Sequence, residues 1–428
     1  MKVYSCILLL ISVCVCSFGQ ENLSLSKAVE KGLAQNYDIL IIKKNEEMAE
    51  ENNSWGQAGR YPTIDLKFAS VNKYEDADDT EVTTNILTPY AELNWTLFNG
   101  FSIFHQKAKL EDLHRLSEGN TAVVVENTIQ AIILQYYTIL LEKEKLLVFG
   151  EVMKLSKDRY DQMLEKKELG SAVTYDVLQA QNSWLEDRTN FLQQEINTEN
   201  SVRQLNLLMG EDENKIYNFT DSLVTELFDY EFDILKEKLF RNNNTLKNQY
   251  INEILSEKEI QIAKAAFWPK LTLYSGIDLL RTTQKINDLP STTTDSYDYF
   301  ANLTLSLNIF NGFNTKRAVE IAKIQQEISK IETEEMKQSL SISLANLLEL
   351  YNVQKELLSL ANENLEAAKL NLKISGEKFK AGNINSFNYR DVQLIYLNSS
   401  ISKVNAIYNL INTNTELTRI TGGIITEG

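Results

Sequence analysis

The sequence is poor in cysteine, proline, glycine and histidine. Its 428 residues include three cysteines, four prolines, 16 glycines and two histidines. The cysteines are Cys6, Cys14 and Cys16, so residues 17–428 hold no disulfide, thiol nucleophile or cysteine metal ligand. Because proline inside a helix removes a backbone donor and clashes with the preceding turn, its scarcity permits long helices.

Positive charge is also in short supply. The formal net charge is −16, which disfavours nucleic acid or an anionic membrane surface as a partner. His105 and His114 do not have the i, i+4 spacing of a helical metal pair. The acidic run at 75–81 could attract a cation, but its composition is typical of a solvated loop. We therefore predict no enzyme activity, no cofactor and no metal site.

The first residues resemble an export signal. Lys2 precedes a short apolar run from Ile7 to Val15, and small residues follow at 17–19. This pattern predicts a secretory signal peptide over residues 1–19. A membrane anchor is the alternative, but the apolar run is too short to span a bilayer. Lipidation of a cysteine is a further alternative, although valine precedes both Cys14 and Cys16.

Elsewhere no stretch has about 18 uninterrupted apolar residues, so no transmembrane helix is predicted. Only a closed β-barrel could then hold the protein in a membrane.

A segment in which apolar and polar residues alternate occurs twice, over 92–101 and 302–313, and each copy ends in Phe-Asn-Gly-Phe. Alternation of apolar and polar residues predicts a strand with two unlike faces. The apolar positions are Leu93, Trp95, Leu97, Leu303, Leu305 and Leu307, and the polar positions are Glu92, Asn94, Thr96, Asn302, Thr304, Ser306 and Asn308.

Long helical patterns follow both copies. Residues from Leu340 to Phe379 carry core positions at steps of four and three, which predicts a coiled coil. Gly100 and Gly312 differ by 212 residues, and so do two later glycine pairs, whereas Pro62 and Pro269 differ by 207. The chain is therefore a tandem duplication. We predict repeat one at 24–210, a connector at 211–231 and repeat two at 232–422, with strands at about 62–98 and 269–310 and single helices over 20–60 and 230–267.

Four strands with an apolar face would leave unpaired edges in a bilayer, so they are expected to close with strands of other chains. Two chains give eight strands, and three give twelve strands around a lumen. The polar positions would then face the lumen and the apolar positions the lipid. The helical pattern that runs from Phe101 to about Leu169 would span roughly 100 Å, so the fold class expected is mainly α, with a membrane β-barrel continued by a helical barrel. A soluble α+β protein is the alternative.

The order of these motifs resembles the TolC family of outer-membrane efflux channels. The resemblance covers residues 20–422 and includes the Tyr61-Pro62 and Trp268-Pro269 strand starts and the segment from Leu169-Gly170 to Gln181. It implies a homotrimer with twelve strands and twelve helices, located in the outer membrane of a Gram-negative bacterium. It also implies a periplasmic adaptor and an inner-membrane pump as partners.

The resemblance also implies site residues at the end of the helices far from the barrel. The turns at Leu169, Gly170, Ala381 and Gly382 would meet the adaptor. Family channels close there through acidic side chains after the turn. The matching positions are Asn388 and Asp391 in repeat two and Asp176 and Gln179 in repeat one, with Phe379 as a nearby aromatic; Asn388 and Ile384 depart from the family pattern.

The function expected is a passive exit duct for small molecules. A type I protein-secretion duct is an alternative, because the pump would choose the cargo. A non-conducting periplasmic tether built from coiled coils is a second alternative.

Overall fold

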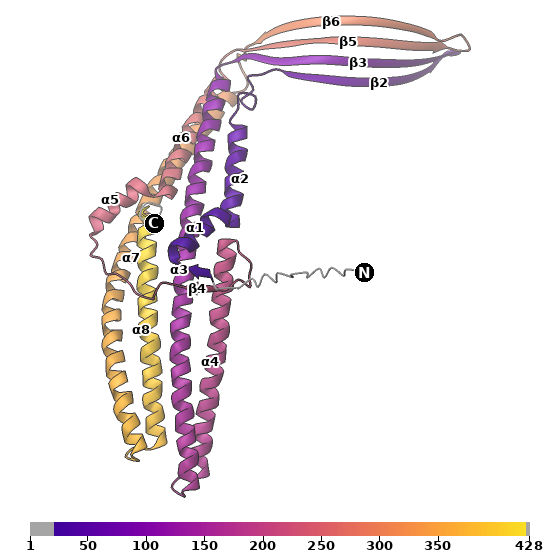
Figure 1. The fold of residues 1–428 in the computed structure, drawn as a ribbon. Coiled ribbons are helices and arrows are strands. Elements are labelled where there is room, and N and C mark those ends of the chain that lie inside the picture. The colour runs from indigo at the N-terminus through magenta and orange to yellow at the C-terminus, as the bar shows by residue number, and fades with distance from the viewer. Residues whose placement is uncertain (1–20, 425–428) are drawn as a thin grey trace, which may run out of the picture.

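The computed structural model describes residues 21–424, so the signal-peptide prediction and all three cysteines lie outside the described residues. The described chain is elongated, with a β-sheet projecting from one end of a bundle of long helices (Figure 1). Each repeat contributes two strands to the sheet and one long helical hairpin to the bundle.

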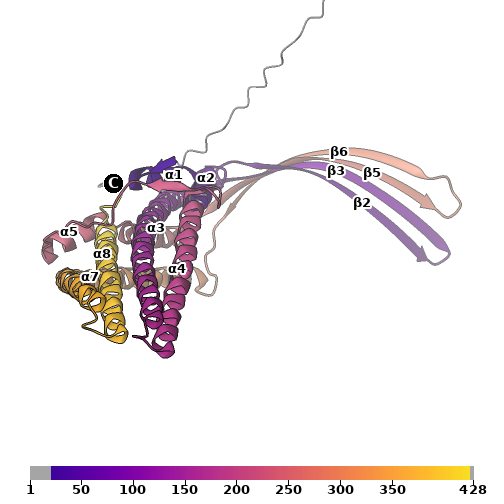
Figure 2. The same ribbon diagram turned by 60° about the horizontal axis from the view of Figure 1, so that its bottom comes forward.

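The sheet contains two hairpins joined side by side. Its strands are β2 (Thr63–Ala77), β3 (Thr80–Asn99), β5 (Lys270–Ile286) and β6 (Thr292–Ser306), in the order β2-β3-β5-β6 and antiparallel throughout. The sheet curves and twists along its length (Figure 2). Strands β2 and β6 are the two edges, and neither has a partner on its outer side among the described residues.

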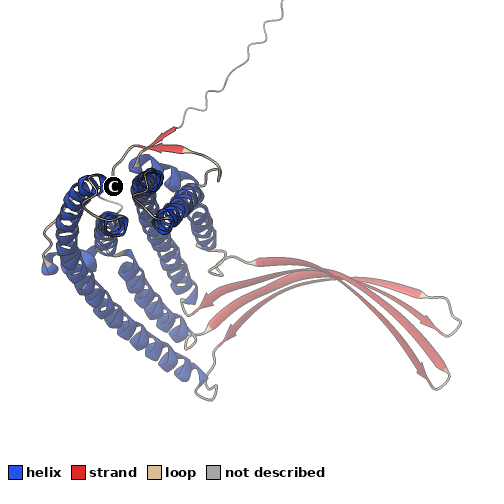
Figure 3. Cartoon of the chain, turned by 90° about the horizontal axis from the view of Figure 1, so that it is seen from below, coloured by secondary structure: helices blue, strands red, loops and turns tan. Residues whose placement is uncertain are grey.

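Four helices form the bundle. They are α3 (Ser102–Glu168), α4 (Thr174–Met209), α7 (Asn314–Lys380) and α8 (Ser386–Ile420). Helices α3 and α4 form one antiparallel hairpin and α7 and α8 the other, and α8 packs against α3. Seen from below, the helices gather on one side of the molecule and the strands project away from them (Figure 3). The two long helices and the turns at Gly170 and Gly382 lie where the sequence predicts them.

The predicted single helices at 20–60 and 230–267 are wrong. The structure has α1 (Leu25–Gln35) and α2 (Tyr37–Asn52) in the first repeat, and α5 (Phe232–Asn242) and α6 (Asn244–Ala265) in the second. Asn36 ends α1 in an extended backbone conformation, and its side chain accepts hydrogen bonds from the first turn of α2. Asn243 separates α5 from α6 in the same way. An asparagine that caps the next helix can therefore break a continuous helical pattern.

A two-stranded parallel sheet was missing from the prediction. It pairs β1 (Glu21–Leu23) with β4 (Tyr217–Phe219), so the connector is partly ordered by the N-terminal segment. Tyr136 of α3 lies buried beneath it and donates a hydrogen bond to the Leu23 carbonyl at 2.9 Å. Strands of three residues are too short to produce an alternating pattern.

Helix α3 is long and apolar enough, by length and composition, to be a membrane-span candidate within residues 21–424, where the sequence predicts none. Ile132, Tyr136 and Ile139 of this helix are fully buried and pack against α4, α8 and the β1–β4 sheet. This packing is that of a core helix.

Candidate functional site

The strand register separates the two kinds of side chain in the sheet. Asn94 pairs with Tyr274, which in turn pairs with Asn302, so these residues share one face. Leu305 pairs with Leu271 on the opposite face. The polar face also carries Glu92, Thr96, Thr304 and Ser306, and the apolar face also carries Leu93, Trp95, Leu303, Ile64, Leu66 and Phe68.

The apolar face is uncovered. Leu66 is 84% exposed and Leu305 is 69% exposed. Contiguous apolar surface of this kind marks a contact with lipid or protein. The polar face is internally paired, because Glu92 forms an ion pair with Lys67 and accepts a hydrogen bond from the Tyr274 hydroxyl at 2.9 Å.

Three residues that the sequence places in strands, Leu307, Asn308 and Leu97, lie outside the regular pairing between strands. Strand β6 ends at Ser306, so Leu307 and Asn308 lie outside it, and the predicted strand to residue 310 is too long. Ser306 pairs with Lys270, the first residue of β5, so the residues after Ser306 have no strand partner within residues 21–424. Leu97 lies in an irregularity of the β3–β5 ladder between Thr96 and Phe98.

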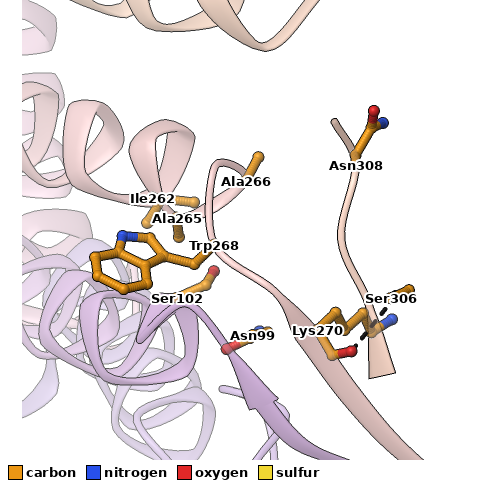
Figure 4. Close-up of a pocket in the computed structure, with 9 residues that line it drawn as sticks. All are labelled: Asn99, Ser102, Ile262, Ala265, Ala266, Trp268, Lys270, Ser306 and Asn308. Atoms are coloured by element: carbon orange, nitrogen blue, oxygen red, sulfur yellow. Dashed lines mark hydrogen bonds between the residues drawn. The ribbon is translucent and has the colours of Figure 1, made fainter. Parts of the chain in front are cut away.

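An open depression of about 350 Å³ lies where the strands meet the helices. Figure 4 shows that Asn308 and Ser306 line it from one side, and Asn99, Ser102 and Trp268 from the other. Lys270 is the only ionisable side chain in its lining. The depression therefore has no acid–base pair or nucleophile–base pair. Among the described residues, no group of three or more histidine, cysteine or acidic side chains could hold a metal ion.

The two turns at the far end of the bundle share one geometry. Gly170 has φ +74° and Gly382 has φ +79°, a left-handed conformation that glycine adopts without strain. A Cβ atom at either position would meet open space, so backbone conformation rather than crowding requires glycine. Leu169 and Ala381, which precede the glycines, are exposed.

Asn388 and Asp391 lie one turn apart near the start of α8, and both side chains are exposed. Asp176 and Gln179, at the start of α4, are half-buried. The exposed positions on α8 continue with Ile395 and Asn398, so Asp391 belongs to a mostly uncharged exposed stripe.

The prediction of Phe379 as a constriction residue is wrong. Its side chain is 1% exposed and stacks on Tyr389, with ring centroids 4.9 Å apart. Lys166 lies over the same ring. A side chain enclosed between α3, α7 and α8 cannot line a duct; Phe379 instead forms the small hydrophobic core of this end of the bundle, together with Met163, Val177 and Ala180.

Sequence reasoning missed a buried charged cluster just behind this core. Arg390 of α8 forms a bidentate ion pair with Asp187 of α4, at 2.6 and 2.8 Å. Arg159 of α3 is 2% exposed, donates to the Ser386 carbonyl and has two buried nitrogens without a hydrogen-bond partner. Burial and the neighbouring Arg390 lower the pKa of Arg159 to about 10. The cluster fastens three helices, and its members are too far apart in sequence to produce a local pattern.

Comparisons with known proteins agree with this geometry. The family described as "Outer membrane efflux protein" matches residues 235–423. Among solved structures, the CmeC outer membrane channel of Campylobacter jejuni is 16% identical, with a TM-score of 0.76 over 93% of this chain and 85% of that chain. The outer membrane protein VceC of Vibrio cholerae is 12% identical, with a TM-score of 0.73 over 93% and 96%.

The open state of the MtrE outer membrane channel of Neisseria gonorrhoeae is 14% identical, with a TM-score of 0.71 over 93% of this chain and 89% of that chain. At these identities the structures show a shared fold. No curated protein sequence matches the chain.

Proposed function

Because the chain belongs to the outer membrane efflux protein family, we propose that it is the exit duct of a tripartite efflux system. It is an outer-membrane protein with a helical part in the periplasm. In this proposal the duct passively conducts small molecules that a periplasmic adaptor and an inner-membrane pump deliver to its helical end.

The sheet is the observation that carries the proposal. It is apolar on one face and polar on the other, and both of its edges are free. Free edges in lipid would leave backbone groups without hydrogen bonds, so the sheet has to close with copies of itself. Three copies give a twelve-stranded barrel, in which Leu305 faces lipid and Ser306 faces the lumen. Such a barrel is wide enough to leave a passage.

The helices extend the duct into the periplasm. A 67-residue helix is roughly 100 Å long, which suits a conduit that crosses much of the periplasm. The exposed turns at Gly170 and Gly382 are the proposed adaptor contacts. Asp391 is the proposed constriction residue, because three copies of an exposed α8 carboxylate would converge on the symmetry axis.

The test is the conductance of the purified protein in planar lipid bilayers. A trimeric duct should give discrete single-channel currents, and light scattering in mild detergent should give the mass of three chains. A periplasmic tether would conduct nothing, and a monodisperse monomer would exclude the trimer.

A further inference from the structure

Two cations and an indole ring come together between α2 and the first strand of the large sheet. Figure 1 shows α2 ending beside the helical end of this sheet. The guanidinium carbon of Arg60 lies 4.7 Å from the centre of the Trp55 ring, and the amine of Lys107 on α3 lies 6.0 Å from it. One ring thus holds cations from two different elements. Trp55, Arg60 and Lys107 are called the Trp55 cluster below.

Neither cation of the Trp55 cluster has an acidic partner within residues 21–424. The Arg60 side chain forms no ion pair or side-chain hydrogen bond there, and the Lys107 amine donates to the neutral Asn53 side chain at 2.6 Å. Both side chains therefore keep N–H donors that are free to bind a further acceptor. In a chain with a net charge of −16, the cluster is a local exception with the chemistry of an anion site.

The Trp55 cluster lies at the helical end of the apolar face of the sheet. Trp95 is on that face, and its indole nitrogen donates to the Arg60 carbonyl at 2.8 Å. Trp95 pairs with Leu273, near the start of β5. The exposed Phe104 of α3 meets Trp55 edge-on, with ring centroids 5.7 Å apart. Aromatic rings of this kind gather where a membrane protein meets the lipid headgroups.

The apolar face above the Trp55 cluster has the length of a membrane-crossing strand. On β5 this face runs from Leu271 to Leu279, with Ser275 as its polar member, and Arg281 follows. A strand tilted by about 45° crosses the hydrocarbon core in about 9–11 residues, which is the length of this face. With the face in lipid, Arg281 lies at one interface and the Trp55 cluster at the interface nearer the helices.

We propose that the Trp55 cluster binds the phosphate group of a phospholipid in the leaflet nearer the helices. The Arg60 guanidinium and the Lys107 amine hold the phosphate oxygens through charge-assisted hydrogen bonds. The acyl chains lie along the apolar face, whose first residue on β2 is the exposed Ile64. This site rests on the proposed function, which puts the apolar face in lipid, and adds a specific lipid contact to it.

The second repeat does not duplicate the Trp55 cluster. The three counterpart positions are uncharged, and the residues there are Ile262, Phe267 and Val319. Val319 is buried, whereas Phe267 is 54% exposed. Each chain therefore has one such site, contributed by its first repeat.

Native mass spectrometry of the purified protein in detergent tests the site. Phosphatidylglycerol is the probe, and a diacylglycerol with the same acyl chains is the comparison without phosphate. Wild type should retain one phosphatidylglycerol per chain and no diacylglycerol, and Arg60→Gln/Lys107→Gln should lose the phosphatidylglycerol. Lys270→Gln is the matched control, because Lys270 begins β5 opposite Ser306 on the polar face. It should retain the lipid as wild type does.

Equal retention of the two lipids by wild type would overturn the lipid site without any variant. Retention of phosphatidylglycerol by the double variant would also overturn it, and would leave Arg60 and Lys107 the role of covering Trp55. Inorganic phosphate in large excess should not displace the lipid, because the acyl chains add contacts. Full displacement would reassign the cluster to a free anion and overturn the lipid.

Conductance separates the lipid site from the duct. The Arg60→Gln/Lys107→Gln variant should give the single-channel currents of wild type, because neither side chain lies on the polar face of the sheet or at the far turns. Loss of the lipid with unchanged currents supports the site. A wild type that conducts nothing but retains phosphatidylglycerol would count against the proposed duct and leave the lipid site standing.

Discussion

Asn36 in the first repeat and Asn243 in the second occupy the same place in the fold. Each caps the helix that follows it, and each donates its side-chain amide to a carbonyl of a long helix, that of Leu208 at 2.9 Å and that of Ile420 at 3.0 Å. The glycines that follow these long helices also correspond, because a Cβ atom at Gly210 or Gly422 would collide with the residue before each asparagine. The elements that shape the backbone are thus duplicated.

The charged contacts are not duplicated. Directly after repeat one, Glu211 accepts hydrogen bonds from Lys31 and Lys215, and the counterpart position directly after repeat two is Gly423. Asp187 is buried in an ion pair, and its counterpart is Ser399. The difference teaches that each repeat keeps the same backbone path while its side chains adapt to different neighbours.

The largest effect is expected from breaking the ion pair between the repeats. Arg390→Ala leaves the carboxylate of Asp187, whose side chain is 3% exposed, without its partner. Removal of one member of a buried pair costs about 3–5 kcal/mol. We expect a clear drop in the thermal unfolding midpoint of the detergent-solubilised protein. Arg203→Ala, which removes an exposed pair with Glu199, should cost less than about 1 kcal/mol. Equal shifts for the two variants would contradict the structural role of Arg390.

The next effect concerns the sheet faces, which the two repeats share. Leu305→Arg should weaken assembly, because arginine on the lipid face costs about 2–4 kcal/mol at the bilayer midplane and less towards the strand ends, where Leu305 lies. Ser306→Arg should assemble, because its side chain lies on the opposite face. The corresponding variants in repeat one are Leu93→Arg, which should behave like Leu305→Arg, and Asn94→Arg, which should behave like Ser306→Arg. Heat-modifiable migration of outer-membrane fractions measures assembly, and equal behaviour of Leu305→Arg and Ser306→Arg would contradict the face assignment.

A smaller effect on stability, which depends on pH, is expected at Glu211. Burial opposes the charged form of Glu211, but hydrogen bonds from Lys215 and Lys31 outweigh it and hold its pKa at about 2, below the ordinary 4.5. Because the pKa of Glu211 is lower in the folded state than in the unfolded state, the ionised carboxylate stabilises the protein above the unfolded-state pKa. This contribution to stability is lost as the pH falls through the folded-state pKa. Glu211→Gln should therefore cost about 1.5–3 kcal/mol at neutral pH. The difference from wild type should shrink between pH 4.5 and about 2. Thermal melts across this range measure it; a difference independent of pH would exclude the carboxylate as its source.

The smallest effect on the fold is expected at Asp391, which is exposed. Asp391→Ala should leave stability unchanged but weaken block of conductance by a trivalent cation added from the periplasmic side. Its counterpart in repeat one is the uncharged Gln179, so only one repeat supplies a ring at this level. Asp176→Ala is the matched comparison. If Asp391→Ala leaves the block unchanged and Asp176→Ala removes it, the constriction lies on α4.

The sequence is sufficient to predict the four strands of the large sheet, the four long helices and the glycine turns, because each depends on a local period or a backbone conformation. It fails at Asn36, where helical residues on both sides hide the break. It also fails at Phe379 and Arg159, because burial depends on which distant helices meet. Asp187 and Arg390 are separated by 203 residues, and no spacing within either helix reveals their contact.

Strand β6 ends at Ser306, five residues before Asn311, whereas β3 continues to Asn99, the counterpart of Asn311 in repeat one. The unpaired stretch after Ser306 carries exposed Leu307, Ile309 and Phe310. In the proposed trimer this stretch would stay without a strand partner until another copy arrives, and an exposed apolar strand end is prone to aggregation. On that proposal, newly made chains have to be kept apart on their way to the membrane, and a chaperone that binds extended apolar segments would be expected to bind each chain here.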